Sequence, residues 1–141
     1  MTKAGRRYLL FTLQGRFYAL DLAQVAEVEE PPLMWPIPGA PSCYPGAMNF
    51  HGAIVAVMDL AAFLGHPGAG GREKVIVLDP AIASLAFLVE RVVRIVPQEQ
   101  VEMSAAPGDA FATALLELPE GTATLLDAAA IAARAAETIN G

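Results

Sequence analysis

Hydrophobic residues at alternating positions open the chain and predict a β-hairpin. Leu9, Phe11 and Leu13 fall on one face of a strand, and Gln14-Gly15 supplies a tight turn. A short bend at Leu22-Ala23 separates the hairpin from a further strand. The pattern predicts strands over residues 8–13, 17–21 and 24–29.

A proline-rich segment follows. Residues 31–45 contain six prolines, a density that excludes a central strand or a helix interior. We therefore expect an ordered, extended loop. Trp35 within it is expected to plug an edge of the core.

The most informative stretch runs from Gly46 to Gly65. Gly46 and Gly52 stand six residues apart, and the apolar run 54–58 follows them. This predicts a strand, a bend that uses glycine, and a buried strand. Asp59 then precedes Leu60 at the start of a short helical turn, where a carboxylate caps free backbone N–H groups.

The second half of the chain repeats this order of elements. The glycine-rich segment 66–72 and residues 105–109 are expected to be loops. Asp127 is expected to cap an alanine-rich helix over residues 127–137. Strands are predicted over residues 74–78, 84–89, 92–96, 110–118 and 122–126.

The two halves therefore predict two similar small barrels. The segment 25–28 echoes the segment 92–95 in its spacing of apolar residues. Short strands with frequent Gly and Pro breaks favour closed or nearly closed barrels over a broad sheet. We expect one all-β domain over residues 1–141, with a first barrel over about 8–66, a second over about 73–126 and the helix 127–137.

Composition and charge narrow the functional classes. The chain of 141 residues is 55% hydrophobic and 17% charged, which excludes a disordered protein. Its net charge of −6 argues against nucleic acid as a partner. The basic residues Lys3, Arg6 and Arg7 are interpreted as a solvated tail.

Cys43 is the single cysteine, so an intramolecular disulfide is impossible and a reducing compartment is favoured. No apolar stretch has the length of a signal peptide core or of a transmembrane helix. We therefore expect a cytoplasmic protein without direct membrane insertion.

The residues do not predict catalysis. The aspartates lack the Thr/Ser-Gly sequence of aspartic proteases, and Cys43 would need His51 or His66 as a base. One cysteine and two histidines without ligand-like spacing predict no metal site, and the glycines of 65–71 lack the Lys-Ser/Thr of a phosphate-binding loop. No catalytic residue, metal or cofactor is expected.

The motif of residues 46–60 resembles the signature of the CheW family of chemotaxis coupling proteins, roughly G-x-x-N-x-R-G-x-I-x-P-x-x-D-L. The matching residues are Gly46, Asn49, Gly52, Ile54, Asp59 and Leu60. His51 stands where the family has Arg, and Ala56 where it has Pro.

Other segments resemble the family in the same order. The amino-terminal pattern is matched by Phe11, Leu13, Tyr18, Val25, Glu27 and Val28. The family's second-half segment is similar to residues 89–95, and its closing Leu-Asp pair matches Leu126-Asp127. The similarity extends from about residue 8 to residue 132.

The resemblance implies two five-stranded Src-homology-3-like barrels that share a hydrophobic joint. It also implies a non-enzymatic adaptor that couples chemoreceptors to a histidine kinase in bacterial chemotaxis or another chemosensory system. One barrel would contact the kinase's regulatory domain through apolar strand-edge residues. The groove between the barrels would take the helical tip of the receptor, and self-association is also possible.

The resemblance also implies the partner-binding residues. Val25, Glu27 and Val28 would lie near the groove, with Val93 and Ile95 opposite, and Gly46, Asn49, His51 and Gly52 would shape the turn near both contacts. Val25 and Val28 could instead belong to the core, and the glycines and Asn49 could serve backbone geometry alone.

His51 removes the permanent charge and planar fork that the family's Arg offers to a carboxylate. Either the partner's acidic residue has changed as well, or that contact is absent. Two other functions stay open: a regulatory barrel domain of another two-component signalling protein, and a small ligand-binding barrel.

Overall fold

The computed structural model describes residues 5–66, 70–106, 108 and 110–140. The first half comprises β1 (Arg7–Leu13), β2 (Arg16–Asp21), the 3-10 turn η1 (Leu22–Gln24), β3 (Val25–Glu29), β4 (Gly46–Phe50), β5 (Ala53–Asp59) and the short helix α1 (Leu60–Phe63). The second half comprises β6 (Lys74–Leu78), β7 (Leu85–Val89), β8 (Arg91–Pro97), η2 (Gln98–Gln100), β9 (Glu102–Ala105), β10 (Ala112–Leu118), β11 (Gly121–Leu126) and α2 (Ala128–Asn140).

The predicted strands and the carboxy-terminal helix are confirmed with boundaries shifted by a few residues. Strand β9 was not predicted, because its residues are all exposed and carry no alternation of apolar and polar side chains. The expected loops at 66–72 and 105–109 fall partly on residues outside the described ranges, as does Lys3 of the expected tail.

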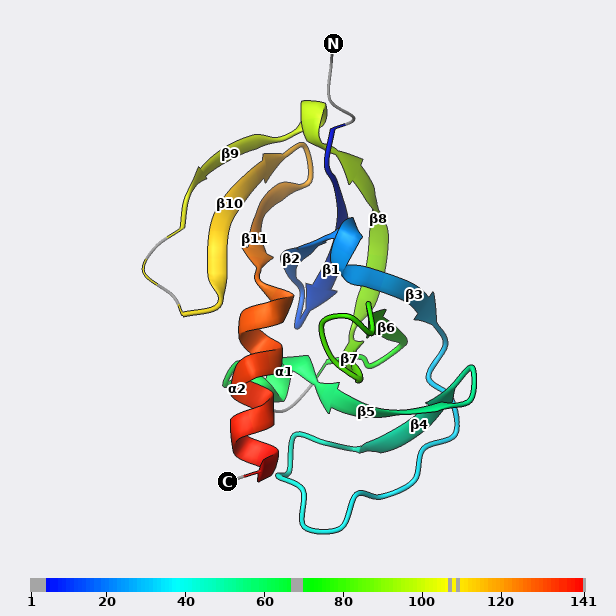
Figure 1. The fold of residues 1–141 in the computed structure, drawn as a ribbon. Coiled ribbons are helices and arrows are strands. Elements are labelled where there is room, and N and C mark those ends of the chain that lie inside the picture. The colour runs from blue at the N-terminus through cyan, green and yellow to red at the C-terminus, as the bar shows by residue number, and fades with distance from the viewer. Residues whose placement is uncertain (1–4, 67–69, 107, 109, 141) are drawn as a thin grey trace.

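The strands form two strongly curved sheets (Figure 1). Sheet A has the order β8-β1-β2-β11-β10-β9, and sheet B has the order β3-β6-β7-β5-β4. The all-β fold with two Src-homology-3-like units is confirmed. The barrels are not closed by hydrogen bonds. Sheet A has six strands instead of five, because β9 pairs with β10 as an additional edge strand.

The sheets correct the expected barrel boundaries. Hairpin β1–β2, from the first half of the chain, pairs with β8 and β11 of the second half. Hairpin β6–β7, from the second half, pairs with β3 and β5 of the first half. The ranges 8–66 and 73–126 are therefore not separate barrels, because the two halves have exchanged their first hairpins.

Alternation along the central strands produces three cores. In β1, Leu9, Phe11 and Leu13 face the joint between the sheets, whereas Tyr8 and Leu10 fill the interior of sheet A. In β7, Leu85, Phe87 and Val89 face the joint, and Ala86 and Leu88 fill the interior of sheet B. The expected hydrophobic joint is confirmed, and both sheet interiors are packed with side chains.

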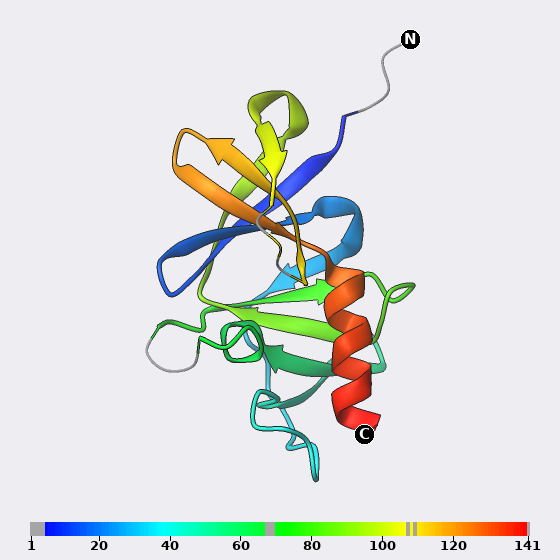
Figure 2. The same cartoon turned by 90° about the vertical axis from the view of Figure 1, so that its left-hand side faces the viewer.

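Helix α2 covers one side of this joint. It begins where the two sheets meet and runs alongside sheet B (Figures 1 and 2). Ile131 and Ala135 are buried against the joint. The Asp127 carboxylate accepts hydrogen bonds from the backbone N–H groups of Ala129 and Ala130, at 3.0 and 3.3 Å, which confirms the predicted cap. Within the described residues, no helix has the length and apolar character needed to cross a bilayer.

The echo between residues 25–28 and 92–95 has a structural counterpart. Strands β3 and β8 are both edge strands. Each contains an irregularity at the same relative position, between Val25 and Glu27 in β3 and between Val92 and Arg94 in β8. The two sheets are therefore built on one plan, and their edge strands correspond.

Candidate functional site

Strand β3 divides its predicted site residues between two faces. Val25 and Val28 lie opposite Leu78 and Ile76, which face the joint. Directly opposed residues of neighbouring strands share a face, so both valines face the joint side. Val25 is half-buried against the joint core, whereas Val28 is 36% exposed at the sheet edge.

Glu27 and Glu29 lie on the other face of β3. They are opposite Val77 and Val75, whose side chains point into sheet B. Because β3 is the edge strand, the two carboxylates extend past the packed interior. Glu29 was not among the predicted site residues, although the two-residue period of a strand places it beside Glu27.

Strand β8 divides its residues in the same way. Ile95 lies opposite Leu9, a residue of the joint, and remains 46% exposed. Val93 occupies the irregularity and packs against the interior of sheet A. The expectation that Val93 and Ile95 share one surface is therefore wrong, because the bulge turns Val93 inward.

The turn between β4 and β5 carries the other predicted residues. The side-chain oxygen of Asn49 accepts a hydrogen bond from the Gly52 N–H at 2.9 Å, which fixes the turn. Gly52 has φ = 86°, in the left-handed region that glycine adopts without strain. Gly46 lies at the far end of β4, where a Cβ atom would stand 2.5 Å from the carbonyl oxygen of Trp35. Both glycines thus have a backbone role.

His51 lies at the tip of this turn, and its side chain contacts strand β3. Its Nε2 atom is 3.4 Å from Oε1 of Glu27, and its ring contacts the Phe50 ring edge-on at 4.4 Å. Hydrogen bonding from Glu29, and then from His51, lowers the pKa of Glu27. The hydrogen bond to Glu27, and then burial, raise the pKa of Glu29. The fold therefore joins three ionisable groups from two separate segments.

An exposed apolar face on sheet B was not predicted as part of the site. Trp35 pairs with Ala47 of β4 through backbone hydrogen bonds of 2.9 and 2.7 Å, so its segment extends the sheet. Trp35 is 51% exposed, which contradicts the expectation that it plugs an edge of the core. Leu33 and Ile54 are exposed more fully. We call Trp35 and Ile54 the apolar face of sheet B.

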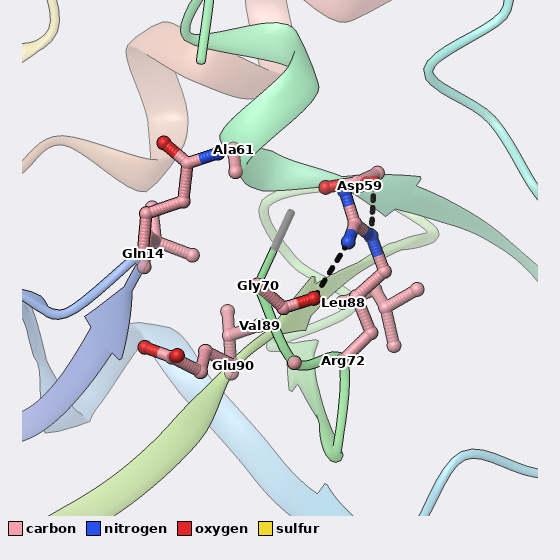
Figure 3. A pocket seen from close by; sticks show the side chains of 10 residues that line it. Gln14, Asp59, Ala61, Gly70, Arg72, Leu88, Val89 and Glu90 are labelled. Atoms are coloured by element: carbon pink, nitrogen blue, oxygen red, sulfur yellow. Dashed lines mark hydrogen bonds and ion pairs between the residues drawn. The ribbon is translucent and has the colours of Figure 1, made fainter. Parts of the chain in front are cut away.

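One polar hollow lies near the crossing of the two sheets (Figure 3). Arg72 donates a hydrogen bond to Asp59 at 2.5 Å and another to the Gly70 carbonyl at 2.9 Å. Glu90 lines the same hollow and accepts the Gly15 N–H at 2.9 Å. The volume of about 10 Å³ holds no more than a water molecule. The hydrogen bonds of Arg72 and Glu90 hold neighbouring segments together, and the hollow has no room for a substrate.

The single cysteine is not activated as a nucleophile. Burial raises the pKa of the Cys43 thiol, whereas a nucleophilic thiol needs a lowered pKa. Among the described residues, the interiors of both sheets are filled by buried side chains.

Comparison with known proteins agrees with this architecture. Residues 7–136 match the CheW-like domain family. Chemotaxis protein CheW of Bacillus subtilis is 22% identical over 107 residues, which are 74% of this chain and 69% of that protein. Protein PilI of Pseudomonas aeruginosa is 34% identical over 55 residues, 39% of this chain but only 31% of PilI.

A solved structure has the same fold. The crystal structure of the scaffolding protein TtCheW from Thermoanaerobacter tengcongensis superposes with a TM-score of 0.77 at 20% sequence identity. The superposition covers 90% of this chain and 92% of that one. The family match over nearly the whole chain, together with this fold, shows that the chain belongs to the CheW-like domain family, whose members include scaffold proteins of chemotaxis signalling.

Proposed function

We propose that this chain is a non-enzymatic adaptor that couples chemoreceptors to a histidine kinase in the bacterial cytoplasm. The observation that carries the proposal is the division of the two edge strands. Strands β3 and β8 each present one exposed apolar residue, Val28 or Ile95, on the side of the joint. Such a surface suits an amphipathic helix, which is the form of a receptor tip.

The second contact is assigned to sheet B. The apolar face of Trp35 and Ile54 is adjacent in register to the turn that carries Asn49 and His51. Aromatic and aliphatic residues beside a charged rim are typical of protein interfaces. We assign this surface, with Glu27, to the regulatory domain of the kinase.

Titration calorimetry with the regulatory domain of each histidine kinase from the same genome tests the kinase contact. We expect saturable binding to at least one domain, weakened by Glu27→Lys or Trp35→Ala. Glu102→Lys is the matched control, because Glu102 is an exposed glutamate on β9 of the other sheet. Absence of binding to every domain, or equal weakening by Glu102→Lys, contradicts this assignment.

Receptor binding is tested separately with a soluble fragment of the receptor's helical tip. Val28→Asp and Ile95→Asp are expected to weaken it, because each places a charge in an apolar contact. Met103→Asp is the control, since Met103 is a similarly exposed apolar residue on β9. If the three variants bind the receptor fragment equally, the joint side is not the receptor surface.

A further inference from the structure

The cluster of Glu27, Glu29 and His51 has the composition of a transition-metal site. One ligand atom from each of the three side chains lies within 4.8 Å of the other two. Imidazole nitrogen with carboxylate oxygen is a ligand set that Zn²⁺ accepts. Three protein ligands leave a fourth position for water or for a group from a partner protein.

The distance between two of these atoms is also that expected for two ligands of one metal ion. His51 Nε2 and Glu27 Oε1 are 3.4 Å apart, which is long for a hydrogen bond between nitrogen and oxygen. Two ligands that bind one zinc ion at about 2.1 Å in tetrahedral geometry stand about 3.4 Å apart. The separation of these atoms is thus already that of two ligands of one metal ion.

The charges around the cluster also favour a cation. Within the described part of the chain, the arginine and lysine ion pairs join Arg6 to Asp21, Arg72 to Asp59, Lys74 to Glu30 and Arg94 to Glu120. None of these basic groups pairs with Glu27 or Glu29, which lie side by side on one face of β3. A divalent cation would neutralise this local excess of negative charge.

The cluster is accessible and partly positioned. The His51 side chain is 72% exposed and that of Glu27 44%, so a metal ion can reach both from solvent. The Phe50 ring holds one edge of the imidazole, and the Asn49–Gly52 hydrogen bond fixes the turn beneath it. The Glu29 side chain is half-buried and brings a carboxylate oxygen within 4.8 Å of the other two ligand atoms.

We propose that Glu27, Glu29 and His51 form a binding site for Zn²⁺ or a similar divalent transition metal, which would tie the β4–β5 turn to the edge strand β3. The proposal is independent of the adaptor function, because it concerns the isolated protein. An arginine in place of His51 has no lone pair for a metal. It could still pair with Glu27, so His51→Arg separates metal binding from charge pairing.

The test is calorimetric titration of the purified chain with ZnCl₂, together with the visible spectrum of the Co²⁺ form, which reports four-coordinate geometry. We expect one saturable site. His51→Arg and Glu29→Gln are expected to weaken zinc binding by at least about tenfold, because each removes a ligand. Zinc is also expected to raise the melting temperature of the wild type but not of His51→Arg.

Two matched variants control for nonspecific effects. His66→Arg makes the same change at the other histidine, and Glu30→Gln removes the neighbouring carboxylate, which pairs with Lys74. Both are expected to bind zinc like the wild type. The proposal is overturned if the wild type shows no saturable binding, if His51→Arg binds zinc as tightly as the wild type, or if His66→Arg loses binding to the same extent.

Discussion

The carboxylate of Glu90 accepts a hydrogen bond from the backbone N–H of Gly15 at 2.9 Å. Glu90 stands between β7 of sheet B and β8 of sheet A, and Gly15 lies in the turn of hairpin β1–β2. The backbone N–H of Glu90 is also bonded to the Thr12 carbonyl, at 3.1 Å. One residue therefore fastens the hairpin at the point where the chain passes between the sheets.

Replacing Glu90 by Gln is expected to make folding stability less dependent on pH. The hydrogen bond from Gly15 is the main cause that lowers the pKa of Glu90 below its ordinary value of 4.5. A lowered pKa adds stability at pH values above 4.5, and this stability is lost as pH falls through the folded-state pKa. We expect Glu90→Gln to cost about 1 kcal/mol at pH 7. Urea unfolding at pH 7 and below pH 4 should show the difference between the two proteins shrinking with acid, and a constant difference would contradict the assignment.

Gly46→Ala is expected to destabilise the protein more than Gly52→Ala. The added Cβ at residue 46 would meet the backbone oxygen of Trp35 at 2.5 Å, and backbone cannot move aside cheaply. Residue 52 has open space but a left-handed φ of 86°. We expect losses of about 2–3 kcal/mol for the first and about 1 kcal/mol for the second. Chemical denaturation measures both, and the reverse order would show that the approach of Trp35 to β4 is looser than described.

Truncation of the joint is expected to lower the stability of the whole molecule. Ile131 is fully buried where α2 packs on residues from both sheets. Ile131→Ala should cost about 3 kcal/mol in the free energy of unfolding. Arg134→Ala, three residues along the helix and exposed, is the control and should change stability little. Similar losses in both variants would contradict the role of packing on the joint.

The hairpin exchange predicts how fragments of the chain behave. Removing residues 67–71, between α1 and β6, divides the chain into fragments 1–66 and 72–141. Each lacks strands that its own strands require as partners, because β1–β2 belongs to sheet A and β6–β7 to sheet B. We expect both fragments to be unfolded alone by circular dichroism and to regain β-structure when mixed. Independent folding of either fragment would contradict the exchanged topology.

The positions of the strands were predictable because their signals are local. Alternation and the Gly, Pro and Asp residues at the ends place ten of the strands and both helices near their observed boundaries. Strand β9 lacks this signal, since all four of its residues are exposed. The prediction for Trp35 was wrong because hydrophobicity alone does not distinguish a core residue from one on a surface.

The pairing of the strands was not predictable from the same local signals. Alternation says which residues share a face, but not which strand lies alongside. One signal did exist: Leu85–Val89 is apolar at every position, which is typical of a strand buried on both faces. The mixed pattern of Val25–Glu29 is that of an edge strand. These two patterns indicate that Leu85–Val89 is a central strand of a sheet and that Val25–Glu29 is an edge strand.

The site was predictable only in part for a related reason. The family resemblance identified Glu27 and His51, and the fold brings them to 3.4 Å from positions 24 residues apart. The resemblance did not identify Glu29. It also grouped Val93 with Ile95, because it gives no sign of the bulge, which reverses the face of every residue beyond it.

The exchanged hairpins also bear on the origin of the molecule. Two copies of a half-length ancestor that swapped their first hairpins would assemble as a symmetric dimer with this arrangement of strands. Joining the copies in one gene turns that dimer into a single chain and frees each copy to diverge. A dimer of identical subunits must present the same surface twice, whereas the fused chain can give β3 and β8 different side chains. The fused chain therefore presents two different edge strands where the dimer would present the same edge twice.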